Sequence, residues 1–210
     1  MQTRLFGVAL IGGGSMAMVA NGAFSPLLPI EAPFAELAGS EVFLARLSLA
    51  AAGLMLVLLG MIGLHIRQAA KVSWFGALAF VLAFCGTAAL MAHEWAQVFF
   101  IHHIAKTVPT ALDAMEDVAG PNLFDAEAII AAASFALGWI LWCGSLLMAH
   151  AFSRLGPVLV LLGLLGAPIL SAIGASLGLN PAWVMAGGGV LFALGWIVLG
   201  RELLKTPVAP

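Results

Sequence analysis

Apolar residues form six long stretches along the chain, and short segments rich in proline and charged residues separate them. A membrane-spanning helix needs about 20 mainly apolar residues to cross a hydrocarbon core of roughly 30 Å, and each stretch reaches that length. The predicted spans are residues 5–24, 42–66, 74–95, 128–152, 157–179 and 182–204. This pattern predicts an all-α fold, an integral membrane bundle of six transmembrane helices that forms a single transmembrane domain over residues 1–210.

The first stretch has a second interpretation as a cleaved signal peptide. Arg4 precedes an apolar run that ends in small residues at positions 20–23, which is the layout of such a peptide. The run is as long as a full span, however, and Asn21 stands where a small apolar residue usually precedes the cleavage site. We therefore interpret this stretch as the first transmembrane helix.

Composition supports a membrane protein and narrows its partners. The chain is 63% hydrophobic and 9% charged, with a mean hydropathy of +1.11, whereas a soluble domain carries about 25% charged residues. A soluble globular fold and a disordered chain are therefore excluded. The net charge of −2 gives no reason to expect a nucleic acid as a partner. The two glycine triplets, Gly12–Gly14 and Gly187–Gly189, lie inside apolar runs rather than in a nucleotide-binding loop. The expected partners are the lipid bilayer and other membrane proteins.

The charged residues divide unequally between the two sides of the predicted bundle. The loops and termini on one side carry Glu202 and the basic residues Arg4, Arg67, Lys71, Arg154, Arg201 and Lys205. The loops on the other side carry two basic residues, Arg46 and Lys106, against Glu31, Glu36, Glu41, Asp113, Glu116, Asp117, Asp125 and Glu127. Because cytoplasmic loops are enriched in Lys and Arg, we predict a multi-pass protein of the cell membrane with both termini cytoplasmic and an acidic outer face.

One short motif occurs twice. Residues 135–140 and residues 192–197 both read Phe-Ala-Leu-Gly-Trp-Ile, and residues 59–62 are a weaker echo in the second span. These three spans would all run from the outside to the inside, so the motif is consistent with a helical hairpin used three times. Convergence is the alternative, because Leu-Gly pairs and interfacial Trp are ordinary in membrane helices.

The interiors of the six predicted spans carry no ionisable side chain. Proton-coupled transporters and ion pumps usually place such a group at mid-depth despite its cost, so the sequence argues against those classes. Cys85 and Cys143 lie within apolar runs and are expected to pack as small hydrophobic residues. No serine-nucleophile motif or Cys–His arrangement is present, so we predict no catalytic residue.

The densest group of polar residues lies at the outer end of the third span and continues beyond it. His93, Glu94, His102 and His103 supply imidazole and carboxylate groups, which are suitable ligands for a divalent metal. His93 and His102 are nine positions apart and lie on opposite faces of a straight helix, so a metal site here requires a bend and further ligands such as Glu31. The alternative is that these histidines are solvated or bonded to loop carbonyls. The apolar character continues to Ala105, so this segment either projects as an extended helix or lies in the interface.

A haem site is a second cofactor hypothesis. His65 and His150 each end a predicted span on the cytoplasmic side, and a haem can be held between two imidazoles on different helices. The alternative is that each imidazole interacts favourably with the C-terminal end of its own helix. The sequence names no cofactor.

The connection over residues 106–127 is predicted to contain a short interfacial helix. Thr110 can cap it, and Leu112, Met115 and Ala119 share one face. That face would rest on the membrane or on the bundle, either as a lid over an outer cavity or as a docking surface.

Function is predicted only by class. The leading hypothesis is a non-catalytic membrane protein, either an accessory subunit of a membrane assembly or a binder of a lipophilic small molecule. The alternatives are a metal- or haem-dependent redox enzyme that uses the outer histidines, and a transporter of a neutral or lipophilic solute. Whether the chain is an enzyme stays open at this stage.

Overall fold

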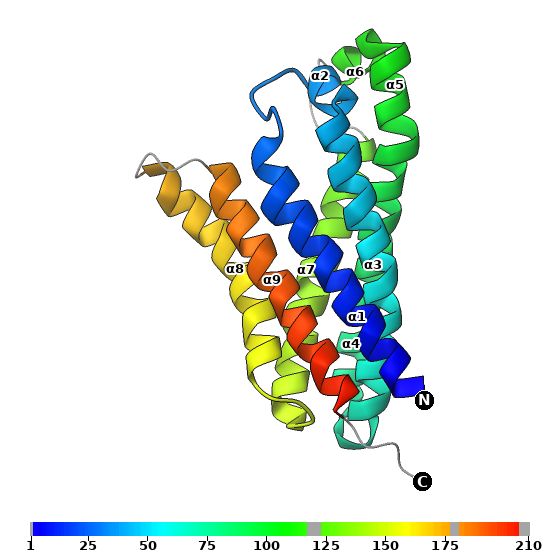
Figure 1. Ribbon diagram of the computed structural model, residues 1–210, viewed down its shortest axis with the longest axis vertical. Coiled ribbons are helices and arrows are strands. Elements are labelled where there is room, and N and C mark those ends of the chain that lie inside the picture. The colour runs from blue at the N-terminus through cyan, green and yellow to red at the C-terminus, as the bar shows by residue number, and fades with distance from the viewer. Residues whose placement is uncertain (1, 117–122, 177–180, 206–210) are drawn as a thin grey trace.

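The computed structural model is all-helical over the residues it describes, which are 2–116, 123–176 and 181–205. Six long helices run roughly along the long axis of the molecule (Figure 1). They are α1 (Gln2–Val19), α3 (Glu41–Gln68), α4 (Trp74–Ala96), α7 (Leu123–Ala149), α8 (Leu155–Ser176) and α9 (Pro181–Leu204). The all-α prediction is confirmed.

Five helical segments are long and apolar enough to cross a membrane. They are Arg4–Leu27, Glu41–Lys71, Trp74–Thr107, Leu123–Ala149 and Trp183–Leu204. The fifth predicted span coincides with α8, in which the apolar helix over described residues is the shorter segment Leu155–Leu170, and residues 177–179 of that span lie outside the described part. These apolar helices indicate a multi-pass membrane protein with five candidate spans among the described residues.

The third span is longer than its predicted end at residue 95. The helix α4 continues through a π-helical segment η4 (Gln97–Ile101) into α5 (His102–Thr107). The apolar run extends to Ala105 and the next helix breaker is Pro109, so nothing in the sequence stops the helix earlier. Of the two predicted courses, the extended helix is therefore the observed one.

Neighbouring helices approach closely where glycines face a neighbouring backbone. A Cβ atom added to Gly86 of α4 would lie 2.4 Å from the backbone nitrogen of Phe135 in α7. A Cβ atom on Gly163 of α8 would lie 2.4 Å from the backbone nitrogen of Phe192 in α9. Close backbone contact through small residues is the usual mode of helix packing in lipid, and it joins α4 to α7 and α8 to α9.

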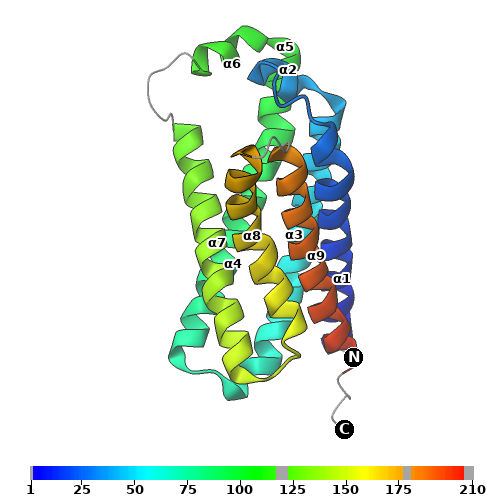
Figure 2. The same ribbon diagram turned by 90° about the vertical axis from the view of Figure 1, so that its left-hand side faces the viewer.

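A small cap covers one end of the bundle, opposite the two termini (Figures 1 and 2). It consists of α2 (Phe34–Gly39), α5 and α6 (Pro109–Glu116). The side chain of Leu112 is fully buried in a cluster with Ala38 and Ile101. The predicted short helix is therefore present as α6, and Leu112 packs within the cap. The predicted helix-capping residue is wrong, because α6 begins at Pro109 and Thr110 lies inside the helix. Asp117 and Ala119 lie outside the described residues.

The centre of the bundle is filled by aromatic side chains. Trp139 is fully buried, with its ring centroid 5.8 Å from that of Phe192 and 5.5 Å from that of Trp196. Its indole nitrogen donates a hydrogen bond of 3.1 Å to the hydroxyl of Thr87, which itself donates to the carbonyl of Ala83 at 2.6 Å. The tryptophans of the recurring motif therefore pack in the core.

Candidate functional site

A cavity of about 370 Å³ lies inside the capped half of the bundle. Figure 1 shows α8 and α9 leaning away from α3 and α4 toward this end. Small and aromatic residues make up most of the wall, and polar groups come from α3, α4 and the segment that follows α1. The described lining residues are Ala17, Asn21, Arg46, Ala50, Leu54, Leu90, Glu94, Ala132, Phe135, Ala136, Gly163, Leu164, Pro168, Met185, Gly188, Gly189, Phe192 and Trp196.

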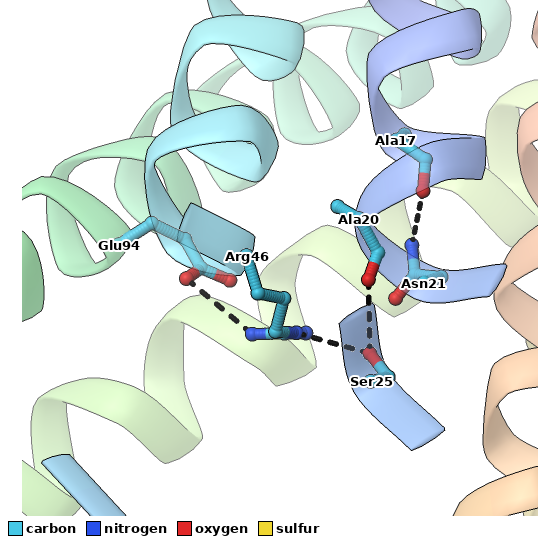
Figure 3. Close-up of polar contacts among 6 residues, drawn as sticks. All are labelled: Ala17, Ala20, Asn21, Ser25, Arg46 and Glu94. Atoms are coloured by element: carbon cyan, nitrogen blue, oxygen red, sulfur yellow. Dashed lines mark hydrogen bonds and ion pairs between the residues drawn. The ribbon is translucent and has the colours of Figure 1, made fainter. Parts of the chain in front are cut away.

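The charged residues in this lining are Arg46 and Glu94 (Figure 3). Glu94 is 8% exposed, and its Oε2 lies 3.8 Å from a guanidinium nitrogen of Arg46. The Nε atom of Arg46 donates a hydrogen bond of 3.1 Å to the hydroxyl of Ser25. The separation of 3.8 Å is an ion pair but too long for a hydrogen bond.

Irregular helix turns place these polar groups. The segment that follows α1 is the π-helix η1 (Ala20–Phe24), which leads into the 3-10 turn η2 (Ser25–Leu27). In η1 the amide of Asn21 donates to the carbonyl of Ala17 at 2.9 Å, and the Ser25 hydroxyl lies 3.3 Å from the carbonyl of Ala20. A second π-helical segment, η4, begins at Gln97, three residues after Glu94. Such π-bulges re-aim side chains and occur often at functional sites.

The buried ion pair corrects the expectation that the bundle contains no ionisable side chain. Glu94 lies at the outer end of the third predicted span, but the structure turns its side chain into the bundle, where Arg46 offsets its charge. Arg46 is a site residue that the sequence analysis missed. The available signal was its position within the apolar run 42–66, where an arginine is costly unless it has a partner.

The four predicted metal ligands are not brought together. The Nδ1 atom of His93 lies 2.5 Å from Oε2 of Glu127 in α7. His102 donates from Nδ1 to the carbonyl of Ala38 at 2.7 Å, and His103 is exposed. Within the described ranges, no group of three His, Cys, Asp or Glu residues is placed to hold a metal. Metal binding by His93, Glu94, His102 and His103 stays a prediction.

The two predicted haem ligands have separate surroundings. The ring of His65 stacks on Phe80 with centroids 3.9 Å apart. His150 follows the end of α7 with a φ of 48°, and its Nδ1 donates to the carbonyl of Met148 at 2.8 Å. This is the left-handed conformation with which helices commonly end, so a local role accounts for the His150 backbone. Haem binding by His65 and His150 also stays a prediction.

The cavity offers few reactive groups. The described lining residues include no serine, cysteine or histidine, and the carboxylate among them is that of Glu94. They offer a carboxylate acceptor, guanidinium donors and three aromatic rings, from Phe135, Phe192 and Trp196. A ligand with an apolar body and one polar group matches such a wall.

Similarity to known proteins gives no information on the function of this chain. No protein-family model, curated protein or solved structure matches this chain.

Proposed function

We propose that this protein binds a lipophilic small molecule in the cavity between its helices. The observation that carries the proposal is a partly open cavity of about 370 Å³ with a mainly apolar wall and one ion pair. Cavities that bind small molecules typically measure about 300–1,000 Å³ and combine an apolar lining with a few convergent polar groups. The volume falls at the small end of that range, which favours a compact ligand.

We propose six spans, with α8 as the fifth. α8 contains 22 residues, which at a rise of 1.5 Å per residue gives a length of about 33 Å. The excess of basic residues near the two termini supports a cytoplasmic location for that end. The capped end and the mouth of the cavity then lie on the outer side of the cell membrane.

The contacts of the recurring motif support three related hairpins, α1–α3, α4–α7 and α8–α9. A Cβ atom on Gly138 would lie 2.4 Å from Cα of Ala83 in α4, and one on Gly195 would lie 2.6 Å from Val160 in α8. A Cβ atom added to Gly60, in the weaker copy of the motif, would lie 2.6 Å from Cβ of Leu10 in α1. In each case the motif glycine packs on the preceding helix of its own hairpin, which is the relation expected of a repeat.

Transport of a neutral or lipophilic solute is a second candidate function. Pro168 lies inside α8 and lines the cavity, and a proline in a helix removes one backbone hydrogen bond and permits bending. Such a bend would let α8 open or close the cavity toward lipid. An accessory role in a membrane assembly is compatible with ligand binding, and co-purification of a stoichiometric partner would support it.

The proposal is tested by filling the cavity. Tritiated naphthalene is measured on bead-bound protein in phosphatidylcholine nanodiscs, with empty nanodiscs as the blank. The variant Ala136→Phe places a ring in the cavity, and we expect it to lower naphthalene affinity by at least about tenfold, or 1.4 kcal/mol. The matched control is Ala133→Phe on the same helix, at an exposed position outside the lining, which should bind like the wild type. Equal binding by both variants and the wild type would contradict the proposal.

The redox alternative has its own readout. An absorption spectrum and elemental analysis of the purified protein would show a Soret band or a stoichiometric metal if the histidines are ligands. Either result, lost in His93→Ala or His65→Ala, would replace the binding proposal with the redox hypothesis.

A further inference from the structure

One oxygen of the buried ion pair lacks a hydrogen-bond donor. Among the described residues, no donor lies within hydrogen-bond reach of Oε2 of Glu94, although this atom is buried. Arg46 is the nearest cation, but its nitrogen is 3.8 Å away and its Nε is already bonded to Ser25. Buried polar atoms in proteins nearly always have a partner, and an unpaired charged acceptor is costly. A donor on a bound molecule can therefore hydrogen-bond this atom.

Arg46 supplies hydrogen-bond donors next to the Glu94 acceptor. A guanidinium carries five N–H groups, and the one hydrogen bond recorded for Arg46 to a described residue uses Nε. A group that both donates and accepts can therefore bond Oε2 of Glu94 and receive a hydrogen bond from Arg46. A hydroxyl or an amide has this capacity, whereas an ether only accepts.

Because Arg46 and Glu94 are neutral as a pair, the site favours a ligand with a neutral head group. Arg46 and Glu94 compensate each other, so a charged head group would bring an extra charge into a space walled mainly by apolar side chains. Burying an uncompensated charge costs several kcal/mol in such surroundings. A neutral donor avoids this cost and can hydrogen-bond Oε2 of Glu94.

We infer that the ligand of this cavity is a compact neutral amphiphile whose head group is a hydrogen-bond donor, a hydroxyl or an amide, bound between Glu94 and Arg46 with its apolar body against Phe135, Phe192 and Trp196. The inference rests on the proposed function and names the class of ligand. The aromatic floor accommodates a flat or cyclic body through ring contacts.

The test uses one apolar skeleton with different head groups. Tritiated naphthalene bound in phosphatidylcholine nanodiscs is displaced by 2-naphthol, 2-methoxynaphthalene, naphthalen-2-ylmethylammonium or 2-naphthoate. The neutral donor 2-naphthol should bind tightest, about tenfold better than the methyl ether, which is the effect expected for one hydrogen bond to a charged group. Equal binding of 2-naphthol and its ether would overturn the inference and leave the proposed function intact. Tighter binding of the ammonium or the carboxylate would also overturn it, and failure of every probe would reject the proposed function itself.

A double variant separates the head-group preference from partition into lipid. Arg46→Met combined with Glu94→Leu removes both charges together, so neither is left unpaired. We expect this variant to retain naphthalene and to bind 2-naphthol and its ether equally. The matched control removes the exposed ion pair between Glu41 and Lys106, which are 3.1 Å apart and outside the lining, and should keep the wild-type preference. A preference that survives in the Arg46/Glu94 double variant would overturn the assignment to this pair.

The donor can belong to a small molecule or to a membrane lipid. Doping the phosphatidylcholine nanodiscs with diacylglycerol, a neutral lipid with a free hydroxyl, distinguishes the two sources. Displacement of 2-naphthol by diacylglycerol would support a bilayer lipid as the source of the neutral donor. Unchanged 2-naphthol binding would contradict diacylglycerol as that source.

Discussion

The two ends of the bundle are built on opposite principles. Near the termini, the long helices interlock through fully buried side chains such as Leu64, Leu199 and Leu203. The charged groups there form hydrogen bonds with backbone groups. Arg67 donates to the carbonyl of Glu202 at 2.6 Å, and the Glu202 carboxylate accepts from the backbone N–H of Ser153 at 2.8 Å. At the capped end, α8 and α9 together lean away from α3 and α4 (Figure 1), and a cavity that contains an ion pair lies there. The packed end supplies stability, and the other end holds the cavity in which we propose that a ligand binds.

The aromatic cluster marks the border between these two ends. Trp139 has no exposed surface and contacts Trp196, which forms part of the cavity floor. A rigid floor allows the cavity to keep its shape while empty, because tightly packed interiors resist collapse.

The largest expected effect on stability comes from removing an aromatic side chain of this cluster. Trp139→Ala should lower the free energy of unfolding by about 3–5 kcal/mol, since it removes a fully buried indole and leaves the Thr87 hydroxyl without its donor. Unfolding in mixed detergent micelles, followed by circular dichroism, measures the change. Trp74→Ala is the matched control, because Trp74 is 76% exposed, and it should leave stability nearly unchanged. A small effect of Trp139→Ala would show that the two ends are equally loosely packed.

A smaller loss of stability is expected from breaking the ion pair on one side. Arg46→Met leaves the Glu94 carboxylate buried without a countercharge, which costs about 1–3 kcal/mol for an unsatisfied group and more if the charge is retained. Adding Glu94→Leu should recover most of that loss, because the remaining charge is then removed as well. The same unfolding assay measures this non-additivity, and additive losses would show that the two side chains are not coupled.

The smallest effect is expected at the surface of the cap. Lys106→Met breaks the ion pair with Glu41, whose side chain is 76% exposed. Exposed pairs contribute about 0.2–1 kcal/mol, so unfolding should be almost unchanged and naphthalene binding should equal that of the wild type. A change in binding would indicate that the cap, as well as the cavity wall, controls access to the site.

The spans could be predicted from the sequence because hydropathy is a local property. The apolar runs give the positions of five candidate membrane helices, and Thr110 with Leu112 marks the cap helix α6. The end of α4 could not be placed, because the same apolar run continues past the membrane boundary into η4. Helix length in that region depends on the cap that stabilises it.

The site could be predicted only in part, because its residues meet through tertiary contacts. Glu94 was singled out, but as one of four metal ligands, and its actual neighbour is Arg46 from another helix. His93 instead contacts Glu127 of α7. No spacing rule within one helix reports these pairs, since they depend on how α3, α4 and α7 are oriented relative to one another.

The most direct test of a ligand-binding cavity is a crystal structure of the protein soaked with 6-bromo-2-naphthol, with anomalous data collected at the bromine edge. The account predicts one bromine peak inside the bundle beside Phe192 and Trp196, with the hydroxyl oriented toward Glu94. Bromine peaks confined to the lipid-facing surface, or none at all, would contradict it.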